Sequence, residues 1–247
     1  GEWSTVAETV WFPLGGTQYD HRCNGAAVSP DNRYVYYNSG SRTEHGEAQD
    51  NKGAYPGLRE IALTSAIFRL PTDGRDIELP NDEAALVSGG YLYADGVRNA
   101  FDIAFAPDGR LLGTENGPDA DFPEELNDLR QGAHYGFPWR FGAQDNPQRT
   151  PGYDASADKR LHRDFLAVRA GMYRDDPEFP PPPGPFTDPI LNLGPDADQS
   201  RLDDGGDLPR PAARLVAGSL GDDDEFQRRL AIGFCPVKLI QHRDAIG

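Results

Sequence analysis

A ten-residue pattern occurs twice in this chain and limits the fold more than any other feature. Residues 26–35 (AAVSPDNRYV) align without a gap on residues 103–112 (IAFAPDGRLL), 77 positions later. Proline presets its backbone angle for a turn, and Asn or Gly tolerates a positive φ, so each copy predicts a β-hairpin. Propeller blades repeat about every 40–50 residues. The spacing therefore suggests a radial β-repeat with the copies one or two blades apart.

Composition supports an all-β fold class. The chain of 247 residues has 28 glycines and 22 prolines against only 37% hydrophobic residues, which favours short strands joined by turns and disfavours a helical bundle. Apolar runs predict the remaining elements. Strands are expected at 9–14, 65–70, near 84–87, at 214–219 and within 230–239, and one short helix is expected within 161–173.

The charge of the chain limits its partners. A formal net charge of −16 repels phosphate backbones and anionic lipid, so we expect no nucleic acid partner and no membrane insertion. No apolar run reaches the ~18 residues that a transmembrane helix needs. The carboxylates suit a divalent cation, although a solvated acidic surface is the commoner explanation. Cys23 and Cys235 lack metal-ligand spacing and could pair only in an oxidising compartment.

Two polar pairs precede the two hairpins at matching positions. Asp20 and His21 come before the first, and Arg98 and Asn99 come before the second. A histidine beside a carboxylate can act as a general base, while an arginine fork with an amide suits a carboxylate or a quinone oxygen. The ordinary alternatives are a turn histidine without a role and an arginine that satisfies loop carbonyls.

A Gly117-Pro118 turn among carboxylates is the candidate metal site. Such a turn leaves carbonyl oxygens unpaired, and Ca²⁺ binds carbonyls together with carboxylates and water. The spacing is not that of an EF-hand, and the neighbouring Glu124-Glu125 pair is equally typical of a solvated charge run or a helix start. The other histidines have no mutual metal-ligand spacing; they are His45, His134, His162 and His242.

These blocks, taken in order, resemble one family. The matching blocks are DHRCNGAAVSPDNRYVYYNSGS, GVRNAFDIAFAPDGRLLGTENGPD and EELNDLRQGAHYGFPW. They are similar to the soluble quinoprotein glucose/sorbosone dehydrogenases, six-bladed β-propellers that use pyrroloquinoline quinone (PQQ) and calcium. The resemblance implies one propeller domain over 1–247, incomplete at about four blades. It is good over 10–140 and weak over the loop-rich 141–247.

The resemblance also implies roles for individual residues. His21 matches the catalytic base, which removes the hydroxyl proton as hydride passes to the quinone. Arg98 and Asn99 match cofactor-binding residues, and the Gly117-Pro118 carbonyls match the calcium ligands. Ser41 departs from the glucose-oxidising branch, which has an acid there. The distal cofactor-binding Lys and Arg of the family have no convincing match after residue 195.

The function implied by the resemblance is oxidation of a sugar, polyol or related aldehyde, with electrons passed to an external acceptor. A periplasmic or secreted location follows from the same likeness, and a homodimer is one option. The alternatives are a truncated, inactive propeller that binds calcium and a propeller lactonase or other hydrolase. An incomplete propeller exposes strand edges, so the isolated chain is expected to be poorly soluble or to oligomerise.

Overall fold

The computed structural model describes residues 2–16, 19–21, 23–48, 57–122, 124–192, 230–233 and 238–243. Over these residues the chain forms two four-stranded sheets, one five-stranded sheet and one two-stranded sheet. The α-helices are short: α1 (Glu83–Ser88) and α2 (Leu166–Arg169). The prediction of an all-β chain is confirmed, and two of the three larger sheets have the four strands of a propeller blade. A closed six-bladed ring and a single domain over 1–247 stay predictions.

The first sheet brings together strands from distant parts of the sequence. Its order is β14 (Leu230–Gly233), β15 (Lys238–Arg243), β1 (Glu2–Thr9) and β5 (Ile77–Leu79). β1 runs antiparallel to β15 and parallel to β5. The strand expected at 9–14 is wrong in position, since β1 ends at Thr9. Pro13 lacks the backbone N–H that a ladder needs, and Gly15-Gly16 favours a turn.

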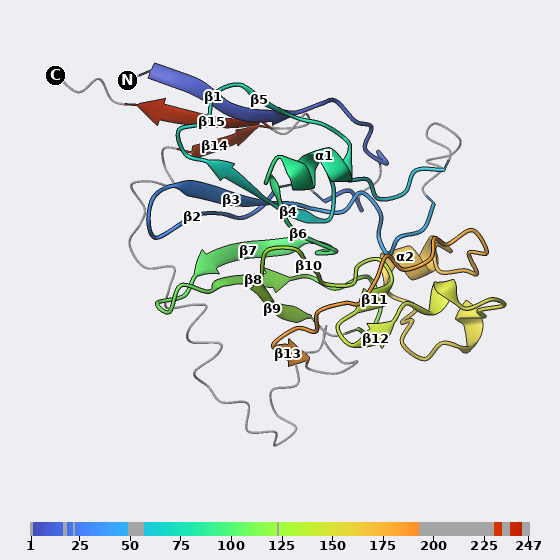
Figure 1. The fold of residues 1–247 in the computed structure, drawn as a ribbon. Coiled ribbons are helices and arrows are strands. Elements are labelled where there is room, and N and C mark those ends of the chain that lie inside the picture. Colours follow the sequence, from blue (N-terminus) through green and yellow to red (C-terminus); the bar gives the residue numbers. More distant parts are fainter. Residues whose placement is uncertain are drawn as a thin grey trace.

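The second and third sheets carry the two repeats. The second has the order β10 (Ala133–His134), β6 (Leu92–Asp95), β4 (Ala66–Pro71), β3 (Tyr34–Ser39) and β2 (Ala26–Val28). The third has the order β13 (Leu191–Asn192), β9 (Glu125–Leu129), β8 (Leu111–Glu115) and β7 (Ala100–Phe105). The three large sheets follow one another side by side, as blades do (Figure 1).

Both predicted hairpins are confirmed. β2 pairs with β3 and β7 with β8, each antiparallel. Asn32 and Gly109 occupy the same position in the two turns and have φ angles of 58° and 87°, the left-handed conformation that the sequence predicted for them. The copies lie in two sheets whose strands β2 and β7 are in contact. The repeat therefore marks equivalent hairpins of neighbouring sheets.

Apolar side chains fill the space between the sheets. One core lies between the first and second sheets and includes Val6, Phe68 and Leu79. Another lies between the second and third sheets and includes Ile67 and Ile103. Burial of such side chains contributes about 1.5–3 kcal/mol each relative to exposure. The sheets are thus held face to face, and their loops come together at one end.

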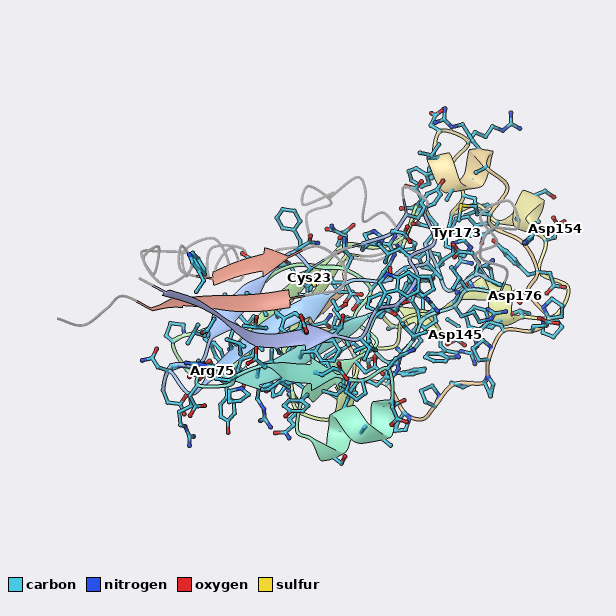
Figure 2. The ribbon with its side chains drawn as sticks, turned by 90° about the horizontal axis from the view of Figure 1, so that it is seen from above. Cys23, Arg75, Asp145, Asp154, Tyr173 and Asp176 are labelled. Atoms are coloured by element: carbon cyan, nitrogen blue, oxygen red, sulfur yellow. The ribbon has the colours of Figure 1, made fainter. Side chains whose placement is uncertain are left out.

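Residues 140–190 are mostly loop. They contain the small sheet of β11 (Arg140–Phe141) and β12 (Gln144–Asp145). Figure 2 shows Asp145, Asp154, Tyr173 and Asp176 gathered at the end of the sheets opposite Arg75. A third apolar core, with Phe122 and Phe137, joins this region to the rest of the chain. These loops therefore cover the sheet end where the candidate site lies.

Two local predictions need correction. The strand expected near 84–87 is the helix α1, because Asp82 caps it by accepting a hydrogen bond from the backbone N–H of Ala85. The helix expected within 161–173 is only the four residues of α2. The strand expected at 214–219 lies outside the described residues. In the described part of the chain, no helix is long and apolar enough to cross a membrane.

Candidate functional site

His21 is held by the loop that follows β3. Its backbone N–H donates to the carbonyl of Ser41 at 2.7 Å, and its Nδ1 lies 2.9 Å from Ser41 Oγ. The Ser41 hydroxyl donates its own proton to the carbonyl of Thr43 at 2.8 Å. Ser41 Oγ must therefore accept from His21, which places the imidazole proton on Nδ1 and leaves the lone pair on Nε2.

The electrostatic surroundings keep His21 neutral. Burial lowers its pKa to about 3, the nearby positive charge of Arg98 contributes in the same direction, and hydrogen bonding to the Ser41 backbone opposes them. Near neutral pH the imidazole is therefore unprotonated and Nε2 offers a lone pair, while the same lowered pKa makes it a weak base. Partial burial also limits competition from solvent. The chemistry available at His21 is that of a general base.

Arg98 is buried, with 4% of its surface exposed, and connects two loops. Its Nη1 donates to the carbonyls of Asn116 at 3.0 Å and Gly117 at 2.7 Å. Its Nε donates to the carbonyl of Glu44 at 2.7 Å, and its Nη2 lies 2.6 Å from Glu44 Oε2. Among the residues that the structure describes, these contacts use four of the five guanidinium hydrogens and leave one on Nη2. Arg98 is thus both a structural clamp and a donor with one remaining hydrogen.

Arg98 and His21 belong to one site. The backbone N–H of Ser41 donates to the carbonyl of Arg98 at 2.7 Å, so the loop that orients His21 is bonded directly to the strand entry that carries Arg98. Asn99 accepts a hydrogen bond from Asn24 Nδ2 at 2.7 Å through its side-chain oxygen. The structure therefore brings His21 together with Arg98, whereas the Asp20 side chain accepts a hydrogen bond from the backbone N–H of Gly15 at 2.8 Å.

The Gly117-Pro118 turn lies beside Arg98. The Gly117 carbonyl accepts from Arg98 Nη1, and the Pro118 carbonyl accepts from the Ala120 N–H at 2.7 Å. A carbonyl oxygen has two lone pairs, so each keeps one for another ligand. Oxygen donors of this kind suit Ca²⁺. Over the described ranges, no three His, Cys, Asp or Glu side chains are grouped to hold a metal, so a cation here would depend on carbonyls.

Two buried carboxyl groups, those of Glu115 and Glu125, lie next to the site. Asn127 donates from Nδ2 to Glu115 at 3.0 Å and to Glu125 at 3.1 Å. Burial raises the pKa of both carboxyl groups, and for Glu115 the charge of Glu125 adds to the effect. Glu115 also accepts a hydrogen bond from the backbone N–H of Arg98. Through the Arg98 backbone this pair holds the segment that leads into β7.

A second set of buried side chains, those of His45, Glu47 and Tyr173, packs in and against the loop that follows Ser41. His45 is fully buried and stacks on Tyr173, with ring centroids 3.9 Å apart. Its Nδ1 lies 3.1 Å from Glu47 Oε2 without the alignment of a hydrogen bond. Burial lowers the pKa of His45 to about 4 and raises that of Glu47 to about 7. These side chains anchor the loop to the 140–190 region.

Sequence inspection missed Glu44. Its partner Arg98 lies 54 positions away, so no local spacing could reveal the pair. Its Oε1 accepts a hydrogen bond from the backbone N–H of Asp119, just after the candidate metal turn. The available signal was weak: Glu44 lies three positions after the end of the His21 block, in a polar stretch without apolar periodicity.

Comparison with known proteins identifies the family. The model of the Glucose / Sorbosone dehydrogenase family matches residues 7–161, which is more than half of the chain. The protein belongs to this family. The family is one of sugar oxidoreductases, and the match spans all the candidate residues described above.

Several relatives are similar over part of their length. Quinoprotein glucose dehydrogenase B of Acinetobacter calcoaceticus is 29% identical over 170 residues, covering 62% of this chain and 34% of the relative. The PQQ-bound aldose sugar dehydrogenase of Streptomyces coelicolor is 27% identical, with a TM-score of 0.35, covering 51% of this chain and 35% of that structure. A Thermus putative oxidoreductase (glucose dehydrogenase) is 29% identical, with a TM-score of 0.34, covering 49% of this chain and 34% of that structure. The chain thus spans about a third of the length of each of these relatives.

Proposed function

We propose that this protein is a PQQ-dependent dehydrogenase that oxidises a sugar or related alcohol or aldehyde, in the periplasm or outside the cell. His21 is the catalytic base, Arg98 and Asn99 contact the cofactor, and the Gly117 and Pro118 carbonyls bind Ca²⁺. Membership of the sugar dehydrogenase family and the quinoprotein relative support the reaction class. An external electron acceptor completes the cycle.

The observation that carries this proposal is the hydrogen-bonded series from Thr43 through Ser41 to His21. It fixes the tautomer of His21 so that Nε2 carries the lone pair. In this role Nε2 takes the proton from the substrate hydroxyl. The hydride on the carbon that bears this hydroxyl leaves to an acceptor. The low pKa of His21 keeps it in the basic form throughout the neutral range.

The surrounding residues fit an anionic, carbonyl-rich cofactor. Arg98 keeps one N–H on Nη2, and Asn99 adds an amide beside it. When bound, PQQ supplies the two-electron acceptor. Arg98 and Asn99 would orient it by hydrogen bonding, and the Gly117-Pro118 turn would hold the cation beside it. Together these residues would hold the quinone, which is the hydride acceptor, beside His21.

Reconstitution tests the proposal directly. Apo-protein is incubated with PQQ and CaCl₂ and gel-filtered, and the quinone absorbance that co-elutes is recorded. Turnover is then measured with a panel of aldoses and an artificial electron acceptor. We expect co-elution of quinone and acceptor reduction that depends on sugar. His21→Ala should lose turnover while it retains the quinone. Absence of both quinone binding and turnover in the wild type would refute the proposed function.

A further inference from the structure

Glu44 joins the two halves of the candidate site through three separate contacts. Its carbonyl accepts from Arg98 Nε, its Oε2 pairs with Arg98 Nη2, and its Oε1 accepts from the Asp119 N–H. The side chain is 3% exposed and Arg98 is 4% exposed, so water screens this pair very little. No role is assigned to Glu44 by the proposed function.

The need for such a residue follows from where Arg98 lies. Arg98 Nη1 is 2.7 Å from the Gly117 carbonyl, the same oxygen that the proposed function gives to Ca²⁺. A cation on that oxygen would face a buried guanidinium, and like charges a few ångströms apart repel strongly where water is excluded. A negative charge on the protein close to both cations would reduce this repulsion.

We propose that Glu44 is a charge-balancing and positioning residue that allows Arg98 and a divalent cation to occupy the Gly117 turn together. This inference rests on the proposed function, and in particular on the proposed cation site. One carboxylate oxygen neutralises Arg98, and the other holds the turn by its Asp119 N–H. Glu44 therefore favours the cation both through its charge and through the backbone geometry that it fixes.

A purely structural role for Glu44 makes a different prediction. Glu60 offers the comparison, because it is also buried in this region and accepts hydrogen bonds from Thr43, Thr64 and Ser65. Its hydrogen bonds do not include Arg98 or the Gly117 turn. If Glu44 only supports the loop, replacing either glutamate should disturb cation binding to a similar extent.

The test is a calcium titration of protein mixed with PQQ, followed by the change in quinone absorbance, for wild type, Glu44→Gln, Glu44→Asp and Glu60→Gln. We expect Glu44→Gln to raise the calcium midpoint at least tenfold. Glu44→Asp, which keeps the charge, should raise it less than threefold, as should Glu60→Gln. Equal midpoints for wild type and folded Glu44→Gln, or equal shifts for Glu44→Gln and Glu60→Gln, would overturn the inference.

A second comparison covers the case in which Glu44→Gln does not fold because Arg98 has lost its partner. Arg98→Met is compared with the double variant Arg98→Met/Glu44→Gln, in which no buried arginine remains. We expect the double variant to bind calcium at least tenfold more weakly than Arg98→Met, and equal midpoints would refute the charge-balancing role. If the wild type shows no calcium response at all, the proposed cation site itself fails, and this inference fails with it.

Discussion

His21 depends on a hydroxyl where the glucose-oxidising branch has a carboxylate. Ser41 can orient the imidazole and fix its tautomer, because its own proton is committed to the Thr43 carbonyl. It cannot stabilise a protonated imidazole as a carboxylate does, because it carries no charge. Ser41 therefore orients the imidazole but does not stabilise its protonated form. Turnover should then depend on how quickly His21 releases the proton that it accepts.

Replacing Ser41 tests the orienting role. Ser41→Ala removes the hydroxyl that accepts from Nδ1, so either ring nitrogen can carry the proton and Nε2 is no longer reliably basic. We expect kcat to fall about tenfold to a hundredfold, less than the roughly 10²–10⁴-fold that a general base contributes, because His21 itself remains, while the KM for sugar changes little. Steady-state kinetics of the reconstituted protein measures both.

The control for that measurement is Ser39→Ala. Ser39 is also buried, and it donates to the Leu63 carbonyl, away from His21. Its loss should reduce stability and leave kcat nearly unchanged. A similar fall in kcat for both variants would show that Ser41 acts through general loop stability.

At the scale of elements, the contact between the repeated hairpins is very close. Gly25 precedes β2, and a Cβ there would lie 2.9 Å from the backbone nitrogen of Ile103 and 3.0 Å from Asp102 Cα, both on β7. Backbone atoms cannot move aside as a side chain can. The neighbouring sheets therefore approach each other at a position that only glycine permits.

Gly25→Ala should separate the second and third sheets. We expect a loss of about 1–3 kcal/mol in the free energy of unfolding, the usual cost of overpacking. Urea denaturation followed by circular dichroism measures it. Gly184→Ala is the matched control, because a Cβ there meets nothing within 4 Å and should change stability by less than about 0.5 kcal/mol. A neutral Gly25→Ala would contradict the close packing.

The loop that carries Glu44 also contains a group sensitive to pH. Burial raises the pKa of Glu47 to about 7 from an ordinary value of 4.5. A carboxyl group that holds its proton more tightly when folded stabilises the fold below about pH 4.5 and loses that contribution as pH rises to about 7. Glu47→Gln should therefore gain stability relative to wild type by about 2–3 kcal/mol between pH 5 and pH 8. Denaturation at several pH values measures the difference; a constant difference would contradict the shifted pKa.

The sequence predicted the elements whose determinants are local. Asn32 and Gly109 identified both turns because positive φ is a property of single residues. The apolar run near 84–87 predicts a strand, but the cap at Asp82 favours the helix α1 instead. The sequence could not identify Glu44, because its ion pair with Arg98 forms only when the sheets have assembled.

The whole molecule carries a formal net charge of −16. Self-repulsion of this size destabilises the folded state, and salt screens it over about 10 Å at 0.1 M. We expect the Tm at pH 7.5 to rise by several degrees between 20 and 300 mM NaCl, as measured by differential scanning calorimetry. Calcium at matched ionic strength should give a further increase if the Gly117 turn binds it. A Tm that falls with NaCl would show that favourable ion pairs dominate.

The first sheet makes the fold dependent on the order of synthesis. β1 lies at residues 2–9, yet its antiparallel neighbour β15 lies at 238–243. A ribosome adds about 5–20 residues per second, so on the order of ten seconds or more separates the two strands. During that interval the edge of β1 that will receive β15 can be taken by another strand, including one from a second nascent chain. Slower translation or a shortage of chaperones should therefore favour strand exchange between copies before either copy is complete.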